Sequence, residues 1–128
     1  MPIEYTIRDG ALRARASGVL DDEGLFEYVR RVIDDPTYDQ VDADLFDARD
    51  VTGVKLTGEG VRKLATLIQS TKRSSSRVAV VASSPAMFGM ARMFELLRPD
   101  VTASVFQEME RAIAWLSAPP EPAPSEER

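Results

Sequence analysis

The feature that most constrains the fold is the change of hydrophobic period along the chain. Residues 3–7 alternate between apolar and polar side chains, which is typical of a strand with one buried face. Asp9 and Gly10 follow, and this dipeptide suits the positive φ angles of a tight hairpin turn. A second alternating run occupies residues 12–20. The two runs predict an N-terminal antiparallel hairpin with one solvated face.

After this hairpin, helical and extended patterns take turns. Apolar residues at helical spacing predict a helix over 21–34 that Asp21 or Asp22 caps, a second helix capped by Thr57, a third that starts at Ser84 and Pro85, and a last one over 109–116. Short apolar runs predict strands over 43–48, 78–82 and 101–106, with a loop over 49–58. The order ββαβαβαβα predicts an α/β fold with a mixed, mostly parallel sheet.

The length of 128 residues fits a single domain, which we expect over residues 1–116. Residues 117–128 consist of Ser, Ala, Pro, Glu and Arg, and such a composition cannot build a core. We therefore expect a disordered Pro/Glu-rich tail.

The absence of cysteine and histidine limits the chemistry open to the chain. It excludes disulfides, thiolate nucleophiles, Ser-His-Asp triads and His-ligated zinc. The acidic stretch between residues 34 and 50 matches no calcium loop, so we interpret it as solvated charge. We therefore expect no enzyme, no metal and no cofactor; an enzyme that used Asp47 with Lys55 or Arg49 is the least favoured class.

Charge and hydropathy restrict the partners. The net charge of −5 does not favour nucleic acid, and no apolar run is long enough for a membrane span. The first residues lack the basic and apolar regions of a signal peptide. We therefore expect a cytoplasmic protein.

Several stretches carry a resemblance to a known family. They are Leu-Phe-Asp-Ala-Arg at 45–49, Arg-Val-Ala-Val-Val-Ala at 77–82, Phe-Gly-Met-Ala-Arg-Met-Phe-Glu at 88–95, Val-Phe-Gln-Glu at 105–108 and Ala-Ile-Ala-Trp-Leu at 112–116. Together with the element order, they resemble the SpoIIAA-like family of the STAS/Sec14-type superfamily over nearly everything before the tail. The resemblance implies a STAS-like fold and a regulatory module that acts by protein–protein switching.

The resemblance also implies a switch residue, a phosphorylatable hydroxyl at the start of the second helix within Asp-Ser-Ser-Gly or Asp-Ser-Thr-Gly. Residues 50–60 do not contain that motif, and their hydroxyls are those of Thr52 and Thr57. Asp47 ends a strand, where ligand crevices of α/β sheets form. Asp47, Thr52 and Thr57 are therefore the candidate switch loop, although helix capping alone accounts for Thr57.

The third helix is more apolar than one buried stripe requires. Its candidate ligand or partner surface consists of Met87, Phe88, Met90, Met93 and Phe94, with Arg92 beside them. The alternative is a helix buried between the sheet and its neighbours. Arg92 either pairs with Glu95, which is three residues away, or anchors an anionic head group.

Two functions follow from these observations. The leading hypothesis is a noncatalytic regulatory module that binds a protein partner or a second copy as a homodimer. The alternative is a carrier or sensor of a lipid-like hydrophobic small molecule. A carrier should have an enclosed cavity of at least a few hundred Å³ lined by the third helix, whereas an interaction module should expose that helix as a patch.

Overall fold

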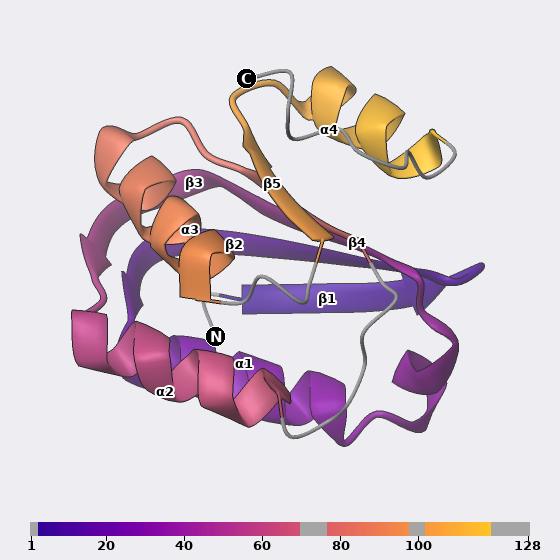
Figure 1. Ribbon diagram of the computed structural model, residues 1–128, viewed down its shortest axis with the longest axis horizontal. Helices are drawn as coiled ribbons and strands as arrows, with labels where there is room; N and C mark the ends of the chain where they lie inside the picture. Colours follow the sequence, from indigo (N-terminus) through magenta and orange to yellow (C-terminus); the bar gives the residue numbers. More distant parts are fainter. Residues whose placement is uncertain (1–2, 70–76, 98–101, 119–128) are drawn as a thin grey trace.

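A five-stranded sheet forms the centre of the computed structural model, which describes residues 3–69, 77–97 and 102–118 (Figure 1). The strands are β1 (Ile3–Arg8), β2 (Ala11–Asp21), β3 (Ala43–Lys55), β4 (Arg77–Val81) and β5 (Thr102–Phe106), and they are neighbours in chain order. β1 and β2 are antiparallel, whereas the other neighbouring pairs are parallel. The predicted mixed sheet and the order ββαβαβαβα are confirmed, with one additional 3-10 helix at Pro36–Gln40.

The hairpin between β1 and β2 turns where the sequence predicts. Asp9 and Gly10 both have positive φ angles, 56° and 78°, and Arg8 pairs with Ala11 across the turn. A two-residue loop with two positive φ angles follows the right-handed twist of the strands that it joins.

Helices cover the two faces of the sheet unequally. α1 (Asp22–Ile33), α2 (Gly58–Gln69) and α3 (Pro85–Leu97) pack on one face, and α4 (Met109–Ser117) packs on the other (Figure 1). The first face holds the larger core cluster, which includes Tyr28 of α1, Leu64 of α2 and Met87 of α3. On the second face, Ala112 packs with Leu45 of β3 and with Ala79 and Val81 of β4. No helix of the described residues is both long and apolar enough to span a bilayer.

Strict alternation along β2 separates the core from the solvated face. Leu12 and Ala14 are buried toward α1, whereas Arg13 and Arg15 point to the other face and are exposed. Because α4 contacts β3, β4 and β5, the α4 side of β1 and β2 remains polar and open to solvent. This polar strip is the wet face that the hairpin pattern predicts.

β3 is longer than the strand that the sequence predicts. The strand predicted over 43–48 continues to Lys55, so most of the predicted loop over 49–58 is strand. The cause is β2, which extends to Asp21 and provides a pairing partner for β3 along its whole length. β3 has 13 residues against 11 in β2, and two bulges, opposite Ala16 and between Gly18 and its neighbour Val19, absorb the two extra residues.

Some predicted features lie outside the described residues. They are Val101, with which the last predicted strand begins, and the tail from Pro119 onward. Ser117, where the tail was expected to start, is the last residue of α4.

Candidate functional site

The start of α2 is the first part of the candidate site. Thr57 precedes the helix, and its Oγ1 accepts a hydrogen bond from the backbone N–H of Gly60 at 2.9 Å. The carbonyl of Thr57 accepts from the N–H of Val61 at 3.0 Å. The predicted role of Thr57 as an N-cap is confirmed, because its carbonyl accepts the first intrahelical bond and its side chain satisfies the Gly60 N–H, which the first helical turn leaves free.

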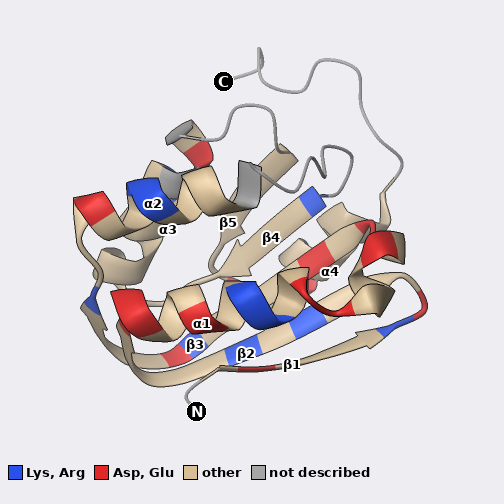
Figure 2. Cartoon of the chain, turned by 90° about the horizontal axis from the view of Figure 1, so that it is seen from below, with Lys and Arg blue, Asp and Glu red and all other residues tan. Residues whose placement is uncertain are grey.

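Asp22, the first residue of α1, holds the same threonine from the other side. Its Oδ1 accepts from the backbone N–H of Thr57 at 3.1 Å, and its Oδ2 accepts from the Thr57 hydroxyl at 2.7 Å. The carboxyl group lies so close to Gly60 that a Cβ at position 60 would overlap it. Both helices therefore start at the same edge of their layer, where acidic residues gather (Figure 2).

The contact between Asp22 and Thr57 is not visible in the sequence pattern, which predicts only that Asp21 or Asp22 caps its own helix. Asp21 fills that role by accepting from the N–H of Gly24 at 2.8 Å. The available signal was Gly60, because a glycine inside a helical pattern costs stability relative to alanine and often has a packing reason.

The predicted surface on α3 divides into buried and accessible residues. Met87 is 6% exposed and belongs to the core, and Phe88 packs against that core. Met90 and Met93 are partly exposed. The side chain of Phe94, which the sequence places in the same surface, lies outside the described residues.

The accessible part of α3 adjoins the start of α2. The Cε of Met93 lies 3.4 Å from the position that a Cβ on Gly58 would take, so the glycine lets the two helices approach closely. Leu96, one turn further along α3, is 74% exposed. The structure thus brings Met93 and Thr57, which belong to two separately predicted sets, to one corner. We call the surface formed by Thr57, Gly58, Met90 and Met93 the α2–α3 corner.

Arg92 lies on the outer side of α3. Its Nε is 3.4 Å from a carboxylate oxygen of Glu95, and its side chain is 60% exposed. Of the two interpretations left open by the sequence, the structure contains the i, i+3 pair. Exposed pairs of this kind contribute less than about 1 kcal/mol to stability.

Asp47 belongs to a different site on the opposite face of the sheet. Both of its carboxylate oxygens accept from the guanidinium of Arg49 at 2.9 Å, and Oδ1 also accepts from the Arg49 backbone N–H. Next to this pair, Arg15 and Asp50 form an ion pair at 2.6 Å. The bulge in β3 explains the cluster, because a bulge re-aims consecutive side chains on one strand.

The charged side chains of this cluster pair with one another, Arg15 with Asp50 and Arg49 with Asp47. The hydrogen bonds from the Arg49 side chain lower the pKa of Asp47 below its ordinary value, although burial acts in the opposite direction. A carboxylate with a lowered pKa stays ionised and is a weak proton acceptor at neutral pH. Asp47 is therefore a structural partner of Arg49.

The structure does not bring the three residues of the candidate switch loop, Asp47, Thr52 and Thr57, together. Thr52 is an exposed strand residue at the second bulge of β3, where it has no register partner in β2. Asp47 faces the α4 side of the sheet, whereas Thr57 begins a helix of the other layer. The separation follows from the continued strand between them.

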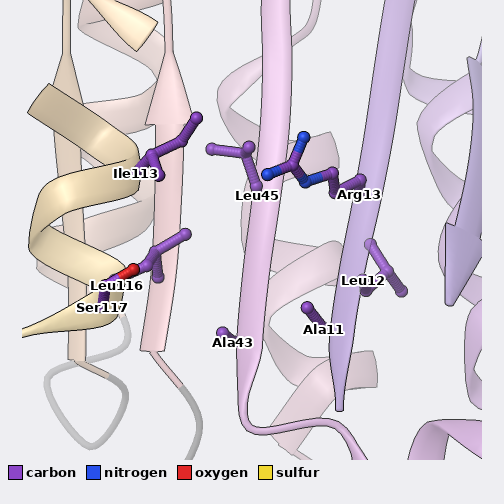
Figure 3. Close-up of a pocket in the computed structure, with 8 residues that line it drawn as sticks. All are labelled: Ala11, Leu12, Arg13, Ala43, Leu45, Ile113, Leu116 and Ser117. Atoms are coloured by element: carbon purple, nitrogen blue, oxygen red, sulfur yellow. The ribbon is translucent and has the colours of Figure 1, made fainter. Parts of the chain in front are cut away.

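A small groove lies between α4 and the polar strip (Figure 3). Its volume is about 120 Å³, and its lining consists of Ala11, Leu12, Arg13, Ala43, Leu45, Ile113, Leu116 and Ser117. Leu45 and Ile113 point toward one another across it, and the Arg13 side chain extends over β3 beside them (Figure 3). None of the described side chains of α3 contributes to this groove. Among the described residues, no cluster of three or more acidic side chains could hold a metal ion.

Comparisons with known proteins agree on one fold. The SpoIIAA-like family profile matches residues 11–117. An anti-sigma factor antagonist from Mycobacterium paratuberculosis superposes with a TM-score of 0.62 at 18% identity, over 91% of this chain and 93% of that one. The anti-sigma factor antagonist SpoIIAA in its unphosphorylated form gives 0.59 at 13% identity, over 91% and 99%. An uncharacterised Shewanella loihica protein with a SpoIIAA-like fold gives 0.56 at 18% identity, over 89% and 93%. No curated protein matches the chain.

Proposed function

The chain belongs to the SpoIIAA-like family, and we propose that it is a noncatalytic regulatory module that recognises a protein partner through the α2–α3 corner. Two solved structures with the same fold are anti-sigma factor antagonists, which supports a role in regulation by protein contact. At sequence identities of 18% and 13%, the partner of this chain has to be identified by experiment.

The observation that carries this proposal is the accessibility of α3. Of the described side chains of this apolar helix, Met87 and Ala91 are buried and Phe88 packs against the core. Met93 is partly exposed beside the start of α2, Met90 is partly exposed three residues before it on α3, and Leu96 is 74% exposed. Methionine side chains adapt to irregular partner surfaces, and apolar residues grouped on a surface mark interaction sites.

The state of the polar groups supports a noncatalytic role. Asp47 is bound to Arg49 and has a lowered pKa, which makes it a poor general base. The Thr57 hydroxyl donates to Asp22 and accepts from Gly60, so it is engaged in structure. With neither histidine nor cysteine in the sequence, neither a thiolate nor a histidine-activated hydroxyl can act as a nucleophile.

The lipid-carrier alternative receives no support from the groove beside α4. Its volume of about 120 Å³ is below the range of about 300–1,000 Å³ typical of small-molecule sites. It is also lined by residues of α4, β2 and β3 and not by described side chains of the third helix. The groove accommodates about one aliphatic side chain.

Site-specific photo-crosslinking in the cells of origin tests the proposal. A photoreactive phenylalanine analogue replaces Met90, and in a second protein it replaces Glu110, which is exposed on α4 across the sheet. We expect position 90, and not position 110, to capture one discrete protein, which is then purified. A captured second copy of the chain would identify a homodimer, and the masses of intact complexes would establish its stoichiometry.

Binding to the purified partner then measures the contribution of the corner. Met90→Asp should weaken binding at least about tenfold, because a central apolar contact contributes about 1–2 kcal/mol or more. Ala114→Asp, which places the same charge on an exposed position of α4, should leave binding unchanged. Equal affinities of the wild type and Met90→Asp would refute the proposed site.

A further inference from the structure

β5 forms one edge of the sheet, and its backbone has a defined free side. The carbonyl oxygen of Phe106 accepts from the N–H of Ala82 at 2.9 Å, so the peptide groups of Phe106 face β4. Because these groups alternate in direction along a strand, Ala103 and Val105 direct their N–H and C=O groups away from β4. No strand within residues 3–69, 77–97 and 102–118 pairs with them. The outer edge of β5 therefore presents two donors and two acceptors.

β5 lacks the features by which proteins commonly protect a free edge. Its sequence, Thr-Ala-Ser-Val-Phe, contains no charged residue and no proline, and its ladder with β4 has no bulge. β1 at the opposite edge differs, because it carries Glu4 and Arg8, and because Arg31 donates to the carbonyl of Ile3 at 2.9 Å. A further strand can therefore add to the β5 edge more readily than to the β1 edge.

The β5 strand of a second copy complements this edge in antiparallel orientation. With Ser104 opposite Ser104 of the second copy, Ala103 lies opposite Val105 of that copy, and each such pair exchanges two hydrogen bonds. The two pairs use all four outward groups of each strand. No like charges meet, since the strand has no charged residue. The edge is thus self-complementary about a twofold axis.

The same register matches the side chains on both faces of the sheet. Val105 packs against the larger core cluster and Phe106 against the cluster beneath α4, and both side chains are partly exposed. In the paired strands, Ala103 of one copy adjoins Val105 of the other, and Thr102 adjoins Phe106. Pairing therefore removes apolar surface from water on the same strand whose backbone groups gain partners.

We propose that the chain forms a symmetric dimer in which two β5 strands pair antiparallel about Ser104 and join the two sheets into one continuous sheet. The inference goes beyond the proposed function, because it concerns the β5 edge and not the α2–α3 corner. The two surfaces are tested by different variants, so the failure of one proposal leaves the other in place.

Charges at the twofold axis test the pairing. Ser104→Lys places two ammonium groups opposite each other in the dimer, and Ser104→Glu places two carboxylates there. Each variant alone should therefore self-associate at least about tenfold more weakly than the wild type. An equimolar mixture of the two should restore dimers, because unlike charges then meet. Analytical ultracentrifugation measures each association constant. Ser17→Lys and Ser17→Glu, at an exposed position of β2, are matched controls that should keep the wild-type value.

Two outcomes of this experiment would overturn the proposal. A wild-type protein that remains a monomer at about 1 mM would leave the β5 edge to an extended segment of another protein. A dimer that both Ser104 variants retain would place the contact on another surface, such as the α2–α3 corner. Restored dimers in the mixture would support the proposal and would also show that each variant is folded.

A single cysteine tests the register of the pairing. The sequence contains no cysteine, so Ser104→Cys introduces the one thiol of the chain. Opposite residues of a non-hydrogen-bonded antiparallel pair have Cα atoms about 4.5 Å apart, within the range of about 4.4–6.8 Å that a disulfide requires. We expect mild oxidation to link Ser104→Cys chains much faster than Ser17→Cys chains. Equal rates for the two variants would overturn the proposed pairing.

Discussion

Arg77 lies over the indole ring of Trp115, with its guanidinium carbon 5.2 Å from the ring centroid. Arg77 opens β4, and Trp115 lies near the end of α4. The same guanidinium donates to the carbonyl oxygens of Trp115 and Ala118, at 2.9 Å for the second. A cation that binds the last carbonyls of a helix satisfies acceptors that the helix leaves free. Arg77 therefore holds the C-terminal end of α4 against the sheet.

Replacement of Arg77 should loosen α4. We expect Arg77→Ala to reduce the free energy of unfolding by about 1–2 kcal/mol, from the lost cation–π contact and hydrogen bonds. The free energy of unfolding of Arg77→Lys should lie between those of the wild type and Arg77→Ala, because an ammonium group keeps the charge but not the planar stack. Urea unfolding followed by Trp115 fluorescence measures both. Arg111→Ala, which removes an exposed pair with Glu108, should change stability by less than about 0.5 kcal/mol.

Gly60→Ala should change the sign of its effect with the residue at position 22. In the wild type, the added Cβ overlaps the Asp22 carboxyl group, so we expect a loss of about 1–3 kcal/mol. In Asp22→Ala that carboxyl group is absent, and the greater helix propensity of alanine should stabilise the protein by up to about 1 kcal/mol. Urea unfolding of the wild type, Gly60→Ala, Asp22→Ala and the double variant measures the effect. A loss of equal size in both backgrounds would contradict the contact.

Acid should destabilise the protein partly through Asp47. Hydrogen bonds from the Arg49 side chain lower the pKa of Asp47 in the folded state. A group with a lowered folded pKa contributes stability that is complete above the unfolded value and is lost as the pH falls through the folded pKa. The loss therefore begins near pH 3.8 and continues below it. Urea unfolding across this range should show a shallower decline for Asp47→Asn; a decline that superposes on the wild type would exclude Asp47 as the source.

Alkali should destabilise the protein through Tyr28. Burial raises its pKa well above 10.0, and burial with the hydrogen bond to Asp35 raises the pKa of Tyr5. A raised pKa gives stability that is complete below the unfolded value, near pH 10, and is lost as the pH rises toward the folded one. Tyr28→Phe keeps the ring contacts with Tyr5 and Phe46 and should reduce this decline. Unfolding midpoints of the wild type and Tyr28→Phe on either side of about pH 10, together with tyrosinate absorbance, measure this decline. Equal declines in the two proteins would contradict the role given to Tyr28.

The features that the sequence predicts correctly depend on local patterns. The hairpin turn at Asp9 and Gly10 and the Thr57 cap each involve residues within a few positions of one another, so their chemistry is visible in the sequence. The order of strands and helices follows from changes of period. These local features were sufficient for the fold class.

The features that were missed depend on long-range pairing. The contact between Asp22 and Thr57 joins residues 35 positions apart, and the continuation of β3 through Thr52 requires the neighbouring β2. Periodicity likewise shows that α3 is apolar but not which residues a neighbour covers, so Met87 and Met90 were placed in the same surface although one is core. Sheet register and helix packing determine these outcomes.

The two bulges of β3 also determine where the chain tolerates a change of length. A residue deleted from the regular stretch 43–47 would shift the register by one position and turn the core side chains of that stretch to the wrong face. A residue deleted at Thr52, which is exposed and has no partner in β2, would convert the second bulge into regular pairing and leave the ladders on both sides in place. Thr52 is therefore the position of β3 at which we expect the loss of one residue to disturb the sheet least.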